Sequence, residues 1–171
     1  MAQAEALEPA LPDTIIAKAE AVLALAHDRD LKLVTAESCT GGMLAALLTD
    51  VPGRSHVFER GFVVYSKAAK CSLLAIERNM VESCGAVSRP VAEAMASGAL
   101  AASEGDVALA VTGFAGPGED DDEEGLVHFA CARHGFAVLH REAHYGAAGR
   151  AEVRRASLET ALELFEEALK L

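Results

Sequence analysis

Hydrophobic positions along this chain alternate between helical and extended spacing, a pattern that predicts an α/β protein. Residues 13–27 carry apolar side chains at helical spacing, and Asp13 or Thr14 can cap the start of this helix. A short apolar run over about 31–36 predicts the first strand, and the apolar stretch after Gly42 predicts a short second helix. Helices that flank a strand in this way indicate a sheet covered by helices.

The rest of the chain adds four strands and four helices. Strands are expected at about 57–64, 106–111, 126–132 and 137–144, and helices at about 66–76, 77–84, 88–103 and 150–169. The last two strands form a hairpin that turns at residues 134–135, so the sheet is mixed. The loops at Ser38, at Tyr65 and at residues 112–118 are then expected to meet at one sheet edge, where such sheets place their chemistry.

Composition indicates one globular unit and excludes some classes of function. The 171 residues are 51% hydrophobic without tryptophan, and we expect a flexible leader at 1–12 and a single domain at 13–171. The net charge of −11 argues against nucleic-acid binding. We find no secretory signal and no apolar run long enough for a membrane span, so the protein is expected to be cytoplasmic and off the membrane. Alanine-rich helices are compatible with a homo-oligomer.

The cysteines, histidines and acidic residues of the sequence show no clear spacing of metal ligands. The cysteines lack the paired spacing of a zinc site and are expected to be reduced thiols; they are Cys39, Cys71, Cys84 and Cys131. The histidines form no ligand set along the sequence, although His140 and His144 can share one strand face. The acidic run at 119–124 is typical of a solvated hairpin tip. We therefore expect no metal and no cofactor.

The segment 35–44 is the strongest candidate for chemistry. Ser38 follows the first strand, and Gly41 and Gly42 let the backbone approach a ligand at the start of a helix whose first N–H groups lack partners. Ser38 is a candidate nucleophile, but a helix-capping role for Ser38 or Thr40 explains the same residues. No Gly-x-Ser-x-Gly motif surrounds the serine, so the sequence gives little support for a Ser-His-Asp triad of the hydrolase type.

Tyr65 and Lys70 offer a base for such a nucleophile. Tyr65 ends a strand, Ser66 caps the next helix, and Lys70 lies about one turn into it. Their spacing does not fit the Tyr-x-x-x-Lys pair of short-chain dehydrogenases. A core aromatic residue and a solvated lysine explain the same pattern without any chemistry.

Arginines at the start of the last helix form a candidate anion site. Arg150 and Arg154 share one helix face, and cations at a helix start oppose its dipole unless an anion is bound there. Surface ion pairs with acids such as Glu152 are the alternative.

Four ordered motifs carry a resemblance to a known family. They are Thr-Ala-Glu-Ser-Cys-Thr-Gly-Gly at 35–42, Phe-Glu-Arg-Gly-Phe-Val-Val-Tyr-Ser at 58–66 followed by Lys70, Gly-Ala-Val-Ser-Arg-Pro-Val-Ala at 85–92, and Val-Thr-Gly-Phe-Ala-Gly-Pro-Gly at 111–118. The chain from about residue 13 resembles the CinA carboxyl-terminal domain family, which includes nicotinamide-nucleotide amidases of the PncC type. The resemblance implies a three-layer α/β/α sandwich with a five-stranded mixed sheet of order 2-1-3-4-5, in which strand 4 is antiparallel.

The resemblance also implies an activity and a site. Amidases of this family deamidate nicotinamide mononucleotide to nicotinate mononucleotide and ammonia without a metal, as a step of pyridine-nucleotide salvage. The implied catalytic residues are Ser38, Tyr65 and Lys70. The implied substrate- and phosphate-binding residues are Glu37, Cys39, Thr40, Gly41, Gly42, Thr112, Gly113, Gly116, Arg150 and Arg154.

Two features of the chain depart from the family pattern. The segment 119–124 is shorter and more acidic than in many relatives and lacks their lysine, so another carboxamide substrate remains an alternative. The residues of this chain match none of the amino-terminal domain of two-domain members, so we do not expect activities of that half from them. A nucleotide-binding accessory protein without catalysis is the other alternative.

Overall fold

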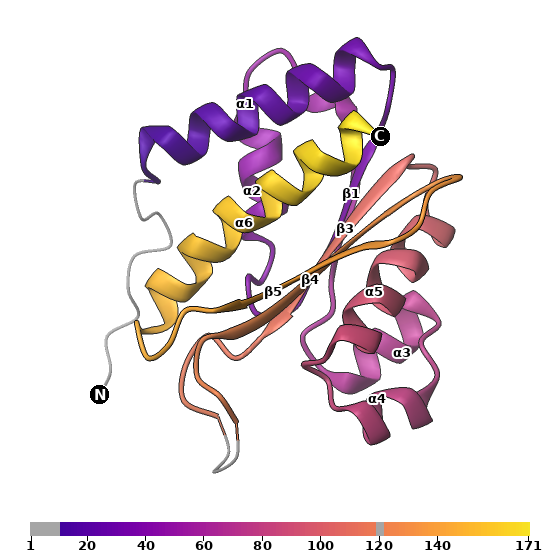
Figure 1. Ribbon diagram of the computed structural model, residues 1–171. Helices are drawn as coiled ribbons and strands as arrows, with labels where there is room; N and C mark the ends of the chain where they lie inside the picture. The colour runs from indigo at the N-terminus through magenta and orange to yellow at the C-terminus, as the bar shows by residue number, and fades with distance from the viewer. Residues whose placement is uncertain (1–10, 119–121) are drawn as a thin grey trace.

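A five-stranded sheet with helices on both faces forms the structure, a computed structural model that describes residues 11–118 and 122–171 (Figure 1). The strands are β1 (Leu33–Glu37), β2 (Phe58–Val63), β3 (Val107–Gly113), β4 (Leu126–Arg133) and β5 (Leu139–His144). The helices are α1 (Asp13–Asp28), α2 (Met43–Asp50), α3 (Lys67–Leu74), α4 (Arg78–Cys84), α5 (Arg89–Ala101) and α6 (Arg150–Lys170), with a 3-10 turn at Ser55–Val57.

The strand order is β2-β1-β3-β4-β5, which confirms the expected α/β fold. Strand β1 pairs in parallel with both β2 and β3, whereas β4 is antiparallel to its neighbours β3 and β5. The connection from β1 leaves the sheet toward β2, and the chain returns on the other side of β1 as β3. The carboxyl ends of β1 and β3 therefore flank the switch point at which open α/β sheets bind ligands.

Two apolar cores hold the three layers together. Helices α1, α2 and α6 cover one face of the sheet, and α3, α4 and α5 cover the other (Figure 1). Leu23, Phe129 and Phe165 are fully buried in the first core, and Met95 and Ala110 in the second. Strand β1 is buried at every position, as expected for a central strand covered on both faces. The residues that follow β1 and β3 thus extend from a rigid base.

Several element ends differ from the sequence prediction. Pro12 occupies the N-cap position of α1, and the predicted cap Asp13 is the first helical residue. Strand β3 continues to Gly113 because its antiparallel pairing with β4 extends to Val127. None of the helices in the described ranges is long and apolar enough to cross a membrane.

Candidate active site

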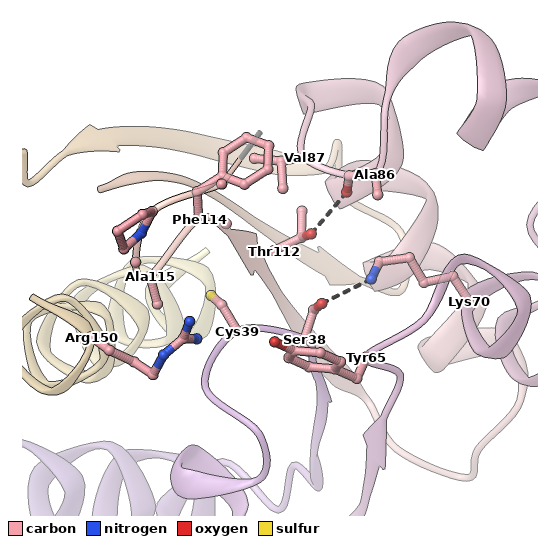
Figure 2. A pocket seen from close by; sticks show the side chains of 14 residues that line it. Ser38, Cys39, Tyr65, Lys70, Ala86, Val87, Thr112, Phe114, Ala115 and Arg150 are labelled. Atoms are coloured by element: carbon pink, nitrogen blue, oxygen red, sulfur yellow. Dashed lines mark hydrogen bonds between the residues drawn. The ribbon is translucent and has the colours of Figure 1, made fainter. Parts of the chain in front are cut away.

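A cavity of about 280 Å³ opens at the carboxyl ends of β1 and β3 (Figure 2). Its volume lies just below the range that is usual for small-molecule sites, roughly 300–1,000 Å³. It is lined by Ser38, Cys39, Tyr65, Lys70, Ala86, Val87, Thr112, Gly113, Phe114, Ala115, Gly116, Pro117, Gly118 and Arg150. The three loops that the sequence predicted to meet at one sheet edge all contribute to this cavity.

Ser38 and Lys70 are in direct contact. The Lys70 Nζ donates hydrogen bonds to the Ser38 Oγ at 2.8 Å and to the Val64 carbonyl at 2.9 Å (Figure 2). Lys70 is 1% exposed and forms no ion pair with a carboxylate of the described residues. Burial without a counter-charge lowers the pKa of Lys70 from 10.5 to about 8. A substantial fraction of the amine is therefore neutral near physiological pH and able to accept the Ser38 proton.

Local structure places these two side chains. Ser66 is the N-cap residue of α3, since its side chain accepts a hydrogen bond from the Ala69 N–H at 3.0 Å, so the helix starts at Lys67, two residues after Tyr65. Lys70 lies one turn into this helix, on its buried side. The Ser38 N–H donates to the Val111 carbonyl on β3 at 2.9 Å, which holds the serine at the centre of the sheet edge.

Tyr65 lies at the mouth of the cavity. Its side chain is 68% exposed, and Figure 2 shows the ring beside Ser38. Among the described residues its hydroxyl forms no hydrogen bond with Ser38 or Lys70. The structure thus brings all three predicted residues to one cavity, but only Ser38 and Lys70 share a hydrogen bond.

Cys39 lines the cavity next to Ser38 and is a second potential nucleophile. Burial raises the pKa of its thiol to about 12, so the sulfur stays protonated at neutral pH. Its backbone N–H has no carbonyl or carboxylate acceptor in the described part of the chain. The thiol is therefore inert, and within the described residues the partner of the amide N–H is the sulfur of its own side chain.

Glu37 holds the loop from inside rather than lining the cavity. Its fully buried carboxylate accepts hydrogen bonds from the Thr40 hydroxyl and from the N–H groups of Gly42, Leu44 and Ala45, at 2.7 to 3.1 Å. Gly42, at φ +97°, is the N-cap residue and has no side chain to offer. Glu37 therefore caps α2 in place of Ser38 or Thr40. The N–H groups of Gly41 and Gly42, which the sequence placed near a bound phosphate, are already occupied.

The two arginines predicted to form a phosphate clamp lie in different surroundings. The Arg154 Nη2 donates to the Thr40 carbonyl at 2.8 Å, and Arg154 does not line the cavity. Arg150 does line it, and its guanidinium packs over Gly116, where an added Cβ would lie 3.1 Å from the Nη2 atom. Within residues 11–118 and 122–171, Arg150 has no acidic partner. Arg150 is thus a cation available to an anionic ligand.

Of the remaining predicted residues, Thr112 and Gly113 line the cavity, whereas Gly41 lies behind it in the turn after Ser38. The Thr112 hydroxyl donates to the Ala86 carbonyl at 2.8 Å, which ties β3 to the loop before α5 (Figure 2). Gly113 packs so tightly on β4 that an added Cβ would lie 2.6 Å from a Val127 methyl group. Gly41 donates its N–H to the Ser38 carbonyl at 3.1 Å and so tightens the turn after the serine. These contacts shape the site without presenting charged groups.

The fold and the cavity define an α/β protein with a buried serine–lysine pair at the switch point of its sheet. The CinA C-terminal domain family matches residues 16–169, and the chain belongs to this family.

Relatives of known sequence include an amidohydrolase that this chain covers over most of its length and a longer CinA-like protein. The chain is 42% identical over 138 residues to the nicotinamide-nucleotide amidohydrolase PncC of Escherichia coli, covering 79% of this chain and 82% of that one. It is 50% identical over 118 residues to a CinA-like protein of Akkermansia muciniphila, covering 68% of this chain but only 28% of the relative. The chain thus spans less than a third of the length of such larger relatives.

Solved structures of the family share the fold. The competence/damage inducible protein CihA from Agrobacterium tumefaciens superposes with a TM-score of 0.90 at 42% identity, covering 96% of this chain and all of that one. A CinA superfamily protein from Escherichia coli superposes with a TM-score of 0.84 at 34% identity, over 96% and 95% of the two chains.

Removal of the Glu37 carboxylate is expected to destabilise the protein. Glu37→Ala leaves buried N–H donors of α2 without acceptors, and we expect the free energy of unfolding to fall by about 3 kcal/mol or more in urea titrations. Glu77→Ala is the matched control, since Glu77 occupies the N-cap position of α4 but forms no side-chain cap bond. Equal, small effects of both substitutions would contradict the capping role.

Proposed function

We propose that this chain is an amidohydrolase that converts nicotinamide mononucleotide to nicotinate mononucleotide and ammonia. The observation that carries the proposal is the 2.8 Å contact between the Lys70 amine and the Ser38 hydroxyl inside a cavity of about 280 Å³. Similarity to the Escherichia coli amidohydrolase over most of both chains supports the choice of substrate.

In the first half of the proposed reaction, Ser38 forms an ester with the pyridine carbonyl carbon. Neutral Lys70 Nζ takes the hydroxyl proton as the Ser38 Oγ attacks the carboxamide, because the two atoms are already hydrogen-bonded. In this proposal the negative charge that develops on the carbonyl oxygen is stabilised by the N–H of Cys39, the residue directly after the nucleophile. The C–N bond then breaks as the Lys70 ammonium returns the proton to the leaving nitrogen, and ammonia departs.

Water completes the proposed cycle. A water molecule attacks the acyl-serine while Lys70 Nζ again takes one of its protons, and that proton then returns to the Ser38 Oγ as the C–O bond to the serine breaks. The carboxylic acid that forms loses its remaining proton to solvent and leaves as nicotinate. Each half-reaction begins and ends with a neutral amine at Lys70. The proposed reaction therefore depends on an amine whose pKa is lowered, and it requires no permanent charge at Lys70.

The cavity wall also suggests how the nucleotide is oriented. Arg150 lines the cavity and has no acidic partner among the described residues, and we assign it the 5′-phosphate. The exposed ring of Tyr65 at the mouth offers a face for the pyridine ring. A direct role of the Tyr65 hydroxyl in proton transfer would require the side chain to turn toward Lys70 when substrate binds. Of the acidic segment 119–124, residues 119–121 lie outside the described residues.

Substitution of the serine or the lysine is expected to abolish turnover. Ammonia release from nicotinamide mononucleotide should fall by about a thousandfold or more in Ser38→Ala and in Lys70→Met, because each removes one member of the proton-transfer pair. Lys67→Met, at an exposed lysine of the same helix, is the matched control and should keep the parent rate.

The outcomes of this assay separate the alternatives. Equal ammonia release by Ser38→Ala and the parent protein would exclude Ser38 as the nucleophile. A parent protein whose melting temperature rises with nucleotide while no product forms would instead be an accessory binding protein. Release of ammonia from another carboxamide alone would keep the mechanism and reject the substrate.

Loss of the Arg150 charge is expected to affect the phosphorylated substrate selectively. Arg150→Met should raise KM for nicotinamide mononucleotide by about tenfold or more and leave kcat/KM for the unphosphorylated riboside unchanged. Arg155→Met is the control, since Arg155 is exposed and paired with Glu152. A parallel loss for both substrates would place the phosphate elsewhere.

A further inference from the structure

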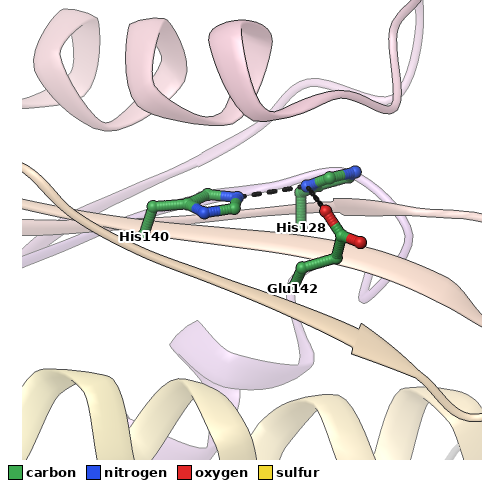
Figure 3. A group of neighbouring side chains, drawn as sticks. All are labelled: His128, His140 and Glu142. Atoms are coloured by element: carbon green, nitrogen blue, oxygen red, sulfur yellow. Dashed lines mark hydrogen bonds and ion pairs between the residues drawn. The ribbon is translucent and has the colours of Figure 1, made fainter.

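Two histidines and a glutamate gather on the α5 side of the sheet, where β4 pairs with the edge strand β5 (Figure 3). His128 lies directly opposite Glu142 in the antiparallel register, and His140 precedes Glu142 by two residues on the same strand face. The His128 Nδ1 lies 3.1 Å from the His140 Nε2 and 3.6 Å from a Glu142 carboxylate oxygen. The Nδ1 atom of His128 thus faces a potential ligand atom of His140 and another of Glu142.

We propose that His128, His140 and Glu142 form a binding site for one Zn²⁺ ion. Their three ligand atoms all lie within 4.8 Å of one another. In a tetrahedral site with bonds of about 2.0–2.1 Å, ligand atoms are separated by roughly 3.3–3.4 Å, so the ion requires only small side-chain shifts. It would replace the proton that the two rings share, and water would occupy the fourth position.

The surroundings of the cluster favour metal binding. The other Glu142 oxygen lies 2.9 Å from the Nε2 of His144, the next residue on this face of β5. Such contacts outside the ligand set are typical of metal sites, because they orient the ligating carboxylate.

A second histidine pair of the same chain provides a contrast. The His27 Nδ1 and the His56 Nε2 also lie 3.1 Å apart, but this pair is exposed. In the described ranges no third ligand joins it, whereas Glu142 completes the cluster at β4 and β5. Within the described residues, the exposed pair therefore lacks the third ligand on which the zinc proposal depends.

The zinc site lies beside the candidate active site but is separate from it. His128 is the cross-strand neighbour of Thr112, which lines the cavity, while none of the three ligands does so. A bound ion would tie the edge strand β5 to β4 behind the cavity wall. The proposal is therefore one of metal binding and stability, and it does not depend on the amidase activity.

Zinc titration of the full chain without a polyhistidine tag tests the site. We expect calorimetry to show saturation at one Zn²⁺ per chain, a higher melting temperature with Zn²⁺, and a Co²⁺ absorption spectrum typical of a four-coordinate ion. His140→Ala and Glu142→Gln should each weaken Zn²⁺ binding by about tenfold or more. His56→Ala is the matched control and should bind as the parent does.

Two results would overturn the proposal. The first is the absence of saturable Zn²⁺ binding by the parent protein. The second is binding that His140→Ala and Glu142→Gln leave unchanged, which would locate the ion elsewhere. Glu142 is exposed at the sheet edge, so Glu142→Gln is expected to fold and to provide a decisive comparison on its own.

Discussion

An amine buried without a counter-charge is the constraint on which the rest of the site depends. Lys70 is removed from solvent, and within the described ranges its amine donates hydrogen bonds only to two neutral oxygen atoms, those of the Ser38 hydroxyl and the Val64 carbonyl. Desolvation of an ammonium group is costly, and the protein avoids much of that cost by lowering the pKa of the amine. The neutral amine that results is a base next to a hydroxyl group, which is the arrangement that acyl transfer by serine requires.

The loop that carries Ser38 is held by groups that the ligand never needs to contact. Glu37 binds the start of α2 from the interior, and Arg154 binds the Thr40 carbonyl from α6. These contacts use most of the polar atoms of the loop internally. The Ser38 hydroxyl, which the Lys70 amine contacts, and the Arg150 guanidinium belong to residues that line the cavity. A rigid loop with few free polar groups is typical of a site that is formed before its ligand binds.

Sequence patterns predicted the architecture well because each strand and helix carries its own periodicity and boundary residues. They also placed Ser38, Tyr65 and Lys70 at one sheet edge, since element order decides which loops meet there. The Glu37 cap was missed because this glutamate precedes α2 by six residues, outside any local capping pattern. The histidine–glutamate cluster was missed because its members meet only through the register of two antiparallel strands.

Direct titration of the Lys70 side chain tests the central claim most closely. In protein with isotope-labelled lysine, the NMR signals next to the Lys70 Nζ should report a pKa of about 8, with the amine losing its proton as pH rises through that value. Assignment follows from the loss of this signal in a Lys70 variant. A pKa near the ordinary 10.5 would mean that the amine stays charged at physiological pH, and it would contradict the assignment of Lys70 as the base for Ser38.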